Sequence, residues 1–442
     1  MSGALINFEK FHRAVRSTNT IVPEGRINKV SGLVVEANGP AMGVGGICDI
    51  RTSSGTLQAE VVGFDDQKVI LMPLGELRDI QPGNTIVKRS GRPFVPMGDV
   101  FLGRVVDGLG NPIDGKGPIA GDTEHPLYGH RVNPLERKLI TEKIDVGVGA
   151  INTMLTMGKG QRMAIMAGSG VGKSMLMGMM SRHTAADVSV IALIGERGRE
   201  VKDFVEKNLG PQGLQRSVVV AATSDSPALV RIRGAHLATA LADYFKDRGR
   251  DVLLMMDSVT RFAMALREVG LAAGEPPTSK GYTPSVFAHI PKLLERPGNF
   301  SGKGSVTGVY TVLVEGDDMN EPIADTVRSI VDGHIVLSRK LAHRGHFPAI
   351  DVLKSVSRVM NDIVDTAHHK ASRELLEMIA VYRDAEDLID IGAYTDGSDP
   401  RIDRAKRMMH RINQFLQQSS HAPAAMEKSL ADMQALLKEA GR

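Results

Sequence analysis

The sequence predicts an α/β core that lies between a small β-barrel on its N-terminal side and an α-helical domain on its C-terminal side. From residue 145 to residue 337, apolar runs alternate with helical patterns, which is typical of a mostly parallel sheet covered by helices on both faces. Before residue 93, short β-rich runs are separated by Gly and Pro turns, and a closed barrel hides the edges of such strands. After residue 357 the pattern becomes helical.

The composition is that of a folded chain with several domains. The 442 residues exceed one compact core, and a typical domain of about 150 residues suggests two or three domains. Lys and Arg number 54 against 51 Asp and Glu, so the charge does not indicate nucleic acid or an acidic lipid surface. The single cysteine, Cys48, excludes an intrachain disulfide and fits a reducing cytoplasm. We see no signal-peptide pattern and no membrane-spanning apolar run, so we expect neither secretion by that route nor a membrane span.

Residues 1–25 are predicted as a separate N-terminal segment that ends at the Pro23-Glu-Gly25 turn. Apolar residues among polar ones favour a short amphipathic helix that binds a partner, and these residues are Leu5, Ile6, Phe8, Phe11 and Val15. A frayed tail is the alternative interpretation.

The β-barrel is predicted over residues 26–92. Its β-rich runs include Val30–Ala37, Gln58–Phe64 and Lys68–Met72, with turns at 39–46, 53–55 and 82–84. The segment Leu102–Gly115 is dense in turn residues, and we interpret it as a linker wrapped on the core.

The α/β core is predicted over residues 93–357. Its strands are expected at Arg162–Ala167, Val188–Gly195, Val218–Ala222, Val252–Asp257 and Val306–Val314. A long helix is expected over Pro227–Lys246, with Ser226 as its N-cap. Residues 358–442 are predicted as a helical domain, with helices at Met360–Arg383, Pro400–Gln418 and Pro423–Ala440.

A glycine-rich loop follows the strand Arg162–Ala167. Residues 167–174 have the sequence Ala-Gly-Ser-Gly-Val-Gly-Lys-Ser, which is typical of a phosphate-binding loop with Ala167 in place of the usual first glycine. Glycines permit backbone conformations that point N–H groups at phosphate oxygens, and the following helix adds its positive dipole end. Lys173 is expected to reach the β and γ phosphates, and Ser174 to ligate Mg²⁺. The predicted phosphate-binding residues are Gly168, Ser169, Gly170, Val171, Gly172, Lys173 and Ser174.

Two acidic residues lie at the ends of neighbouring predicted strands. Asp257 follows five apolar residues, as needed for a carboxylate that holds Mg²⁺ beside the phosphate loop, and a helix N-cap is the alternative. Glu196 follows the strand that starts at Val188 and is the candidate general base for an attacking water. Arg197 joins it as a catalytic candidate, and a solvated helix start is the alternative for both residues.

Four segments carry a family resemblance. They are Gly-Glu-Arg-Gly-Arg-Glu at 195–200, Asp-Ser-Val-Thr-Arg-Phe at 257–262, Gly-Glu-Pro-Pro-Thr-Ser-Lys-Gly-Tyr at 274–282 and Ser-Val-Ser-Arg at 355–358. Together they resemble the ATPase of bacterial type III protein export. The chain is similar over nearly its whole length to the flagellum-specific member, and more distantly to the catalytic subunit of rotary ATP synthases. The resemblance implies a β-barrel, a RecA-like P-loop ATPase core, a helical C-terminal domain and a ring-shaped homohexamer.

The resemblance also implies roles for individual residues. Lys173 and Ser174 match the phosphate lysine and the magnesium ligand, and Glu196 matches the catalytic glutamate. Arg358 matches the arginine that reaches a neighbouring subunit's site, where it stabilises charge on the transferring phosphoryl group. Phe347 resembles the position that stacks an aromatic ring on adenine, with a core phenylalanine as the alternative. The implied ligands are ATP and Mg²⁺.

The leading hypothesis is an ATP-hydrolysing motor subunit of flagellar protein export, and the injectisome version of the same enzyme is the nearest alternative. The resemblance implies a cytoplasmic protein, peripherally associated with the export apparatus of the inner membrane. Its implied partners are other copies in a hexamer, a regulatory protein on the N-terminal segment, a central stalk protein, export chaperones and substrates, and the membrane export gate.

Two further classes remain as alternatives. A nucleic-acid translocase is expected to show a basic, aromatic-rich barrel, and the near-neutral charge and absence of tryptophan argue against a nucleic-acid partner. A non-catalytic nucleotide-binding ring subunit is expected to lack the glutamate at position 196, which is present.

Overall fold

A computed structural model describes residue 8 and residues 23–89, 94–129, 133–314, 316 and 318–440. The chain divides into two compact units, one of residues 1–93 with Ala272–Gly274 and one of all other residues. Apart from Phe8 and residues 23–25, the predicted N-terminal segment lies outside the described residues. Among the described helices none is both long and apolar enough to cross a membrane.

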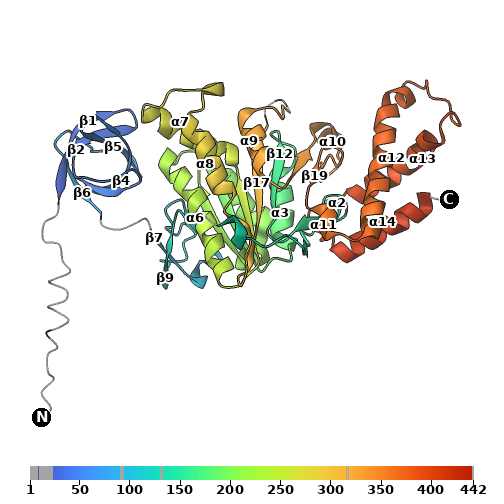
Figure 1. The fold of residues 1–442 in the computed structure, drawn as a ribbon, viewed down its shortest axis with the longest axis horizontal. Helices are drawn as coiled ribbons and strands as arrows, with labels where there is room; N and C mark the ends of the chain where they lie inside the picture. The colour runs from blue at the N-terminus through green and yellow to red at the C-terminus, as the bar shows by residue number, and fades with distance from the viewer. Residues whose placement is uncertain are drawn as a thin grey trace, which may run out of the picture. The chain divides into compact units, whose positions relative to one another are not determined.

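The first unit contains a closed six-stranded barrel with the strand order β1-β2-β5-β4-β3-β6 (Figure 1). Side chains that alternate along the strands fill its interior, as the buried positions of Val35, Ile50 and Leu71 show. The strands are β1 Glu24–Ser31, β2 Val34–Asn38, β3 Ile47–Thr52, β4 Gly55–Asp65, β5 Lys68–Pro73 and β6 Thr85–Lys88. The predicted barrel is therefore confirmed.

Two details of the barrel differ from the sequence prediction. The run Val30–Ala37 is not one strand but the facing ends of β1 and β2, because Gly32 turns the chain with a φ of 57°. Strand β3 was not predicted, since its polar residues Asp49 and Arg51 interrupt the apolar pattern while Cys48 and Ile50 point into the barrel.

The second unit is built on a nine-stranded sheet with the order β19-β18-β12-β17-β15-β13-β14-β8, while β16 pairs with β17. Its pairings are parallel except for those of β16 and β19. The strands are β8 Arg104–Asp107, β12 Arg162–Ala167, β13 Val188–Ile194, β14 Ser217–Ala222, β15 Val252–Asp257, β16 Gly298–Asn299, β17 Ser305–Leu313, β18 Gly333–Leu337 and β19 Val356–Ser357. Two small two-stranded sheets pair β7 Phe94–Met97 with β9 Thr123–Pro126 and β10 Lys143–Ile144 with β11 Met157–Gly158.

Helices cover both faces of this sheet (Figure 1). The α-helices are α2 Gly149–Met154, α3 Lys173–His183, α4 Gly198–Asp203, α5 Gly210–Gln215, α6 Ala228–Asp247, α7 Val259–Ala272, α8 Pro284–Leu294, α9 Pro322–Ile330, α10 Arg339–His343, α11 Met360–Ile363, α12 Thr366–Asp390, α13 Pro400–Leu416 and α14 Met426–Ala440. Short 3-10 helices lie at Asp99–Phe101, Pro134–Glu136 and Ser279–Gly281, and a π-helical turn lies at Phe204–Leu209. Together with the barrel, this sheet and these helices confirm the predicted fold class.

Alternating side chains of the central strands pack on different partners. Ile165, Ile191 and Met255 belong to one hydrophobic cluster with α3 and with the C-terminal helices. That cluster includes Leu375 of α12 and Ile412 of α13, so the C-terminal helices share a core with this face of the sheet. The other face packs against α6, which contacts β13, β14 and β15.

The segment Leu102–Gly115 is not only a linker, as predicted, because it contributes the edge strand β8. Arg104 donates two hydrogen bonds to the carboxylate of Asp114, at 2.8 and 3.0 Å, and this ion pair closes the turn that follows β8. Gly108 permits close packing against α6, since a Cβ atom there would lie 2.4 Å from the carbonyl oxygen of Val230.

Two predicted helix features are wrong. The helix predicted at Met360–Arg383 is two helices, α11 and α12, and Asp365 caps α12 by accepting a hydrogen bond from the His368 N–H at 2.8 Å. Ser226 does not cap α6, because Pro227 occupies the N-cap position and the Ser226 hydroxyl pairs with Thr223 instead.

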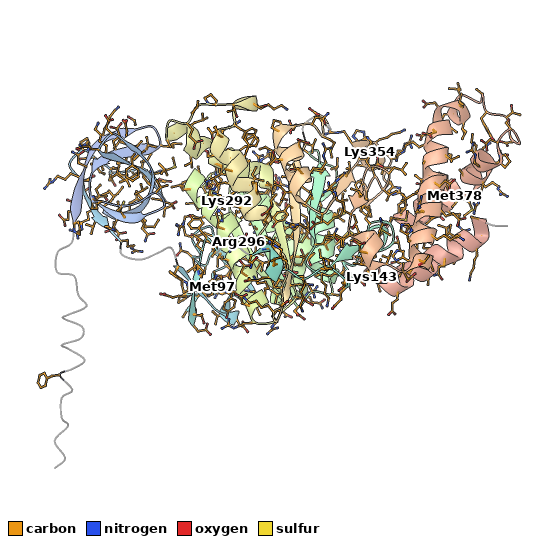
Figure 2. The ribbon with its side chains drawn as sticks, viewed as in Figure 1. Met97, Lys143, Lys292, Arg296, Lys354 and Met378 are labelled. Carbon is orange, nitrogen blue, oxygen red and sulfur yellow. The ribbon has the colours of Figure 1, made fainter. Side chains whose placement is uncertain are left out.

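A buried charge cluster fixes the α6 face to the neighbouring segments. Asp243 of α6 accepts hydrogen bonds from Arg296 at 2.7 Å and from Lys246 at 2.9 Å, and all three side chains are at most 13% exposed. Arg296 also donates to the carbonyl oxygen of Leu127, and Lys246 lies over the Phe300 ring. Figure 2 labels Arg296 within this unit.

The Asp243→Asn variant should lower the free energy of unfolding by about 3–5 kcal/mol, because it removes the carboxylate that binds the buried Arg296 and leaves Lys246 with only its longer contact to Asp247, at 3.6 Å. Urea unfolding followed by circular dichroism measures this change. The matched control is Glu206→Gln, which removes an exposed pair with Lys202 and should cost less than about 1 kcal/mol. Equal losses in both variants would contradict a special role of the buried cluster.

Candidate functional site

The phosphate-binding loop joins the end of β12 to the start of α3. Gly170 and Gly172 have φ angles of 78° and 90°, a region that favours glycine because it has no Cβ atom. A Cβ atom on Gly172 would also lie 3.4 Å from the ring of Phe347. Lys173 is the first residue of α3, an 11-residue helix, so the loop and the positive end of the helix dipole point to the same place.

Lys173, Asp257 and Glu196 meet beside this loop. The Lys173 Nζ atom lies 2.5 Å from Asp257 Oδ1 and 3.4 Å from Glu196 Oε1. The three side chains are 12%, 4% and 13% exposed, so their charges are largely removed from water. The structure therefore brings together a cation and two acids that the sequence placed in three separate segments.

The parallel register explains this meeting. Strands β13 and β15 are neighbours, and Asp257 at the end of β15 stands opposite Leu193 near the end of β13. Glu196 follows β13 by two residues and thus emerges at the same edge of the sheet. Strand β12 ends at that edge too, since it runs parallel to β17, which in turn runs parallel to β15.

Burial and neighbouring charges shift the pKa values of Glu196 and Lys173. Burial raises the pKa of Glu196 to about 7, with repulsion from Asp257 adding to the rise and attraction to Lys173 opposing it. For Lys173, burial lowers the pKa, but attraction to Asp257 and Glu196 outweighs burial, and the net pKa is raised above its usual value. Lys173 thus stays charged, and Glu196 titrates near neutral pH.

The donor set fits Mg²⁺ that arrives with a nucleotide. Ser174 offers a hydroxyl and Asp257 a carboxylate, which are the hard oxygen ligands that Mg²⁺ prefers, with phosphates and waters completing its shell. Within the described parts of the chain there is no group of three or more His, Cys, Asp or Glu residues that could hold a metal ion on its own. The site therefore suits a cation bound jointly by protein and phosphate.

Arg358 lies at the opposite edge of the same sheet. Its neighbour Ser357 in β19 pairs with Gly333, the first residue of β18, whereas the phosphate loop follows Ala167, which pairs with Leu337 at the end of β18. The exposed Arg358 side chain donates hydrogen bonds to the carbonyl oxygens of Val331 and Arg328, at 3.2 and 3.3 Å. Arg358 is therefore separated from the phosphate loop of its own chain by the length of β18.

Two other candidates lie at the margin of the site. The half-buried Phe347 faces Gly172 of the phosphate loop, and its carbonyl oxygen accepts a hydrogen bond from the Gln418 N–H at 3.0 Å. Arg197 has an 82% exposed side chain that pairs with Glu200 at 3.4 Å, so it lies largely in solvent and not among the buried groups of the site. The nearby carboxylate of Glu200 also helps to raise the pKa of Glu196.

Sequence reasoning missed Thr311. Its hydroxyl donates a hydrogen bond of 2.7 Å to Asp257 Oδ1, the same oxygen that Lys173 contacts. A weak signal was present, because Thr307 and Thr311 are among the hydroxyl residues of the mostly apolar strand β17, together with Ser305 and Tyr310. Their roles could not be distinguished without the position of β15.

Three family models match successive parts of the chain. The nucleotide-binding domain of the ATP synthase alpha/beta family matches residues 147–357, and the β-barrel domain of that family matches residues 27–91. The T3SS EscN ATPase C-terminal domain matches residues 364–435.

Individual proteins are similar over almost the whole chain. The flagellum-specific ATP synthase of Bacillus subtilis (strain 168) is 51% identical over 96% of this chain and 97% of its own. The type 3 secretion system ATPase of Xanthomonas euvesicatoria is 48% identical over 92% of each chain.

Solved structures give the same result. The assembled ATPase EscN from the type III secretion system of enteropathogenic E. coli matches with a TM-score of 0.89 and 44% identity, over 93% of this chain and all of that chain. EscN in complex with its central stalk EscO matches with a TM-score of 0.86 and 43% identity, over the same shares of both chains. The family resemblance inferred from four motifs is thus confirmed, and this chain belongs to the flagellum-specific and type III secretion ATPases of the ATP synthase alpha/beta family.

Proposed function

We propose that this ATPase hydrolyses ATP to ADP and phosphate as a subunit of a homohexameric motor that assists flagellar type III protein export. The observation that carries the proposal is the buried contact of Lys173 with Asp257 and Glu196 directly beside a phosphate-binding loop. Identity of 51% to a flagellum-specific relative supports the flagellar system, and injectisome export is the second candidate because its relatives reach 48%.

Each residue of the site has its own role in ATP hydrolysis. Lys173 exchanges its two carboxylate partners for the β and γ phosphates when ATP enters the loop formed by residues 168–172. Glu196 then accepts a proton from the attacking water, so it must be ionised at that moment. Ser174 and Asp257 would hold Mg²⁺, which would neutralise charge on the phosphates when bound. Phe347 stacks on adenine, and Arg197 assists from the rim of the site.

We assign Arg358 to the site of a neighbouring subunit. Its side chain lies at the end of the sheet opposite to its own phosphate loop, so a second chain must bring a phosphate loop to it. An arginine in this role neutralises charge that develops on the transferring phosphoryl group. Turnover would then require assembly, which the assembled state of EscN supports.

The partners follow from the same relatives and from the sequence. EscN bound to its central stalk EscO supports a stalk protein as partner of this chain. We further propose a regulatory protein on residues 1–25, export chaperones and substrates, and the membrane export gate as partners of a cytoplasmic protein peripheral to the inner membrane. The proposed domains are a barrel at 26–92, an ATPase domain at 93–357 and a helical domain at 358–442.

The Lys173→Ala variant should bind ATP weakly and lose turnover, because it removes the charge that holds the phosphates. Glu196→Gln should retain ATP binding but lose turnover, since an amide cannot accept the proton. Equilibrium binding of a fluorescent ATP analogue and phosphate release measure the two effects. Normal turnover of Glu196→Gln would refute its assignment as the base.

The same Lys173→Ala substitution in the source bacterium distinguishes the two export systems. Loss of flagellar filaments with intact effector secretion supports the flagellar proposal. Intact filaments with lost effector secretion would favour the injectisome.

Turnover should also depend on pH. Because burial raises the pKa of Glu196 to about 7, the base is increasingly protonated below that pH. The value of kcat/KM, which reports the free enzyme, should therefore fall by up to about tenfold per pH unit below pH 7 and level off above it. Circular dichroism over the same range checks that the protein stays folded. A flat profile between about pH 5.5 and 8 would contradict a base of this kind.

Arg358→Ala should reduce turnover by roughly a thousandfold or more without unfolding the chain. Its loss removes only two hydrogen bonds from an exposed side chain. A mixture of Lys173→Ala and Arg358→Ala proteins should regain activity, because some interfaces then combine an intact loop with an intact arginine. The control is Arg78→Ala, an equally charged change at an 83% exposed side chain of the barrel unit, which should leave turnover unchanged. No recovery in the mixture would argue against shared sites.

A further inference from the structure

We infer that Thr311 is a positioning residue for the magnesium-bound state, an inference that rests on the proposed ATPase function. Its hydroxyl holds the carboxylate of Asp257 in the orientation that a metal or its bound water requires. The evidence is a 2.7 Å hydrogen bond from Thr311 Oγ1 to Asp257 Oδ1, made between residues that are 0% and 3% exposed.

The strand register sets this contact. Strands β15 and β17 run parallel, with Met256 opposite Tyr310, so the next residues, Asp257 and Thr311, lie side by side at the end of the sheet. A β-branched residue has restricted χ1 rotamers, so its hydroxyl is directed by the backbone of β17 rather than by a flexible stem. Thr311 therefore offers Asp257 a donor that is fixed before any ligand binds.

The need for such a donor becomes clear when Lys173 changes partner. Lys173 and Thr311 both contact Oδ1 of Asp257, at 2.5 and 2.7 Å. Lys173 must turn to the phosphates of a bound nucleotide, which removes one of these two contacts. The Thr311 hydrogen bond does not depend on the nucleotide, so it keeps the buried carboxylate oriented after Lys173 has left.

A neighbouring threonine provides a matched control on the same strand. Thr307 is also fully buried, and its hydroxyl accepts a hydrogen bond from the Gly160 N–H at 2.9 Å. Three residues separate the two threonines, and Thr307 lies toward the start of β17, away from Asp257. Replacing either threonine with valine removes one buried hydroxyl of the same strand, but only one of the two changes affects Asp257.

The test measures equilibrium binding of a fluorescent ADP analogue to the full chain, with Mg²⁺ and with a chelator. ADP avoids turnover, so the ratio of the two affinities reports the metal contribution directly. Thr311→Val should reduce this ratio by roughly tenfold, as expected for the loss of a partner that orients a ligand, and should leave metal-free binding unchanged. Thr311→Ser, which restores the hydroxyl, should recover the wild-type ratio within about twofold. Thr307→Val should keep the wild-type ratio even if its melting temperature falls.

Two results would overturn the inference. An unchanged ratio in Thr311→Val would mean that Asp257 needs no help from the hydroxyl. Equal reductions in Thr311→Val and Thr307→Val would mean that the effect is a general loss of packing in β17. If Thr311→Val does not fold, the smaller Thr311→Ala variant is measured in the same way. Failure of the wild-type chain to bind ADP at all would instead refute the proposed function, which separates the two conclusions.

Discussion

The second unit depends on one constraint, which is that neighbouring parallel strands end at the same edge of the sheet. This constraint produces the buried contact between Lys173 and Asp257. Four strands, β12, β13, β15 and β17, deliver Lys173, Glu196, Asp257 and Thr311 to this edge. Charges that leave water must be paired, and each acid here has a cation or a hydroxyl as partner. The contacts of Lys173 with Asp257 and Glu196 therefore order the site before a nucleotide binds, and a bound nucleotide would replace these contacts.

The two faces of the nine-stranded sheet pack against their helices through different interactions. The α6 face carries the buried cluster of Asp243, Lys246 and Arg296, which ties α6 to the segments at 127 and 296. The opposite face continues as one hydrophobic cluster from the sheet through α3 into the C-terminal helices. One side therefore holds α6 to its neighbouring segments by buried charges, while the other side connects the sheet to the C-terminal helices.

Polar contacts reinforce that connection next to the phosphate loop. Glu386 of α12 binds Lys340 and Arg344 at 2.7 and 2.8 Å, and both cations precede Phe347 by few residues. Asp351, four residues after Phe347, binds Arg383 of α12 at 3.1 Å. The segment that faces Gly172 is therefore held from both sides by one helix of the C-terminal region.

Local sequence determined the parts of this protein whose geometry is set by neighbouring residues. The bounds of β12 and β15 match the predicted strands residue for residue, because unbroken apolar runs favour buried strands. The phosphate loop could be predicted from its glycines and the Lys-Ser pair, because the backbone conformation of such a loop is set locally.

Tertiary structure alone decided that Thr311 meets Asp257, that Arg358 lies at the far edge of the sheet and that Arg104–Asp107 is a strand. These facts depend on which strands are neighbours and in which direction they run. Periodicity along the chain does not encode strand order, so only the assembled sheet could place those side chains.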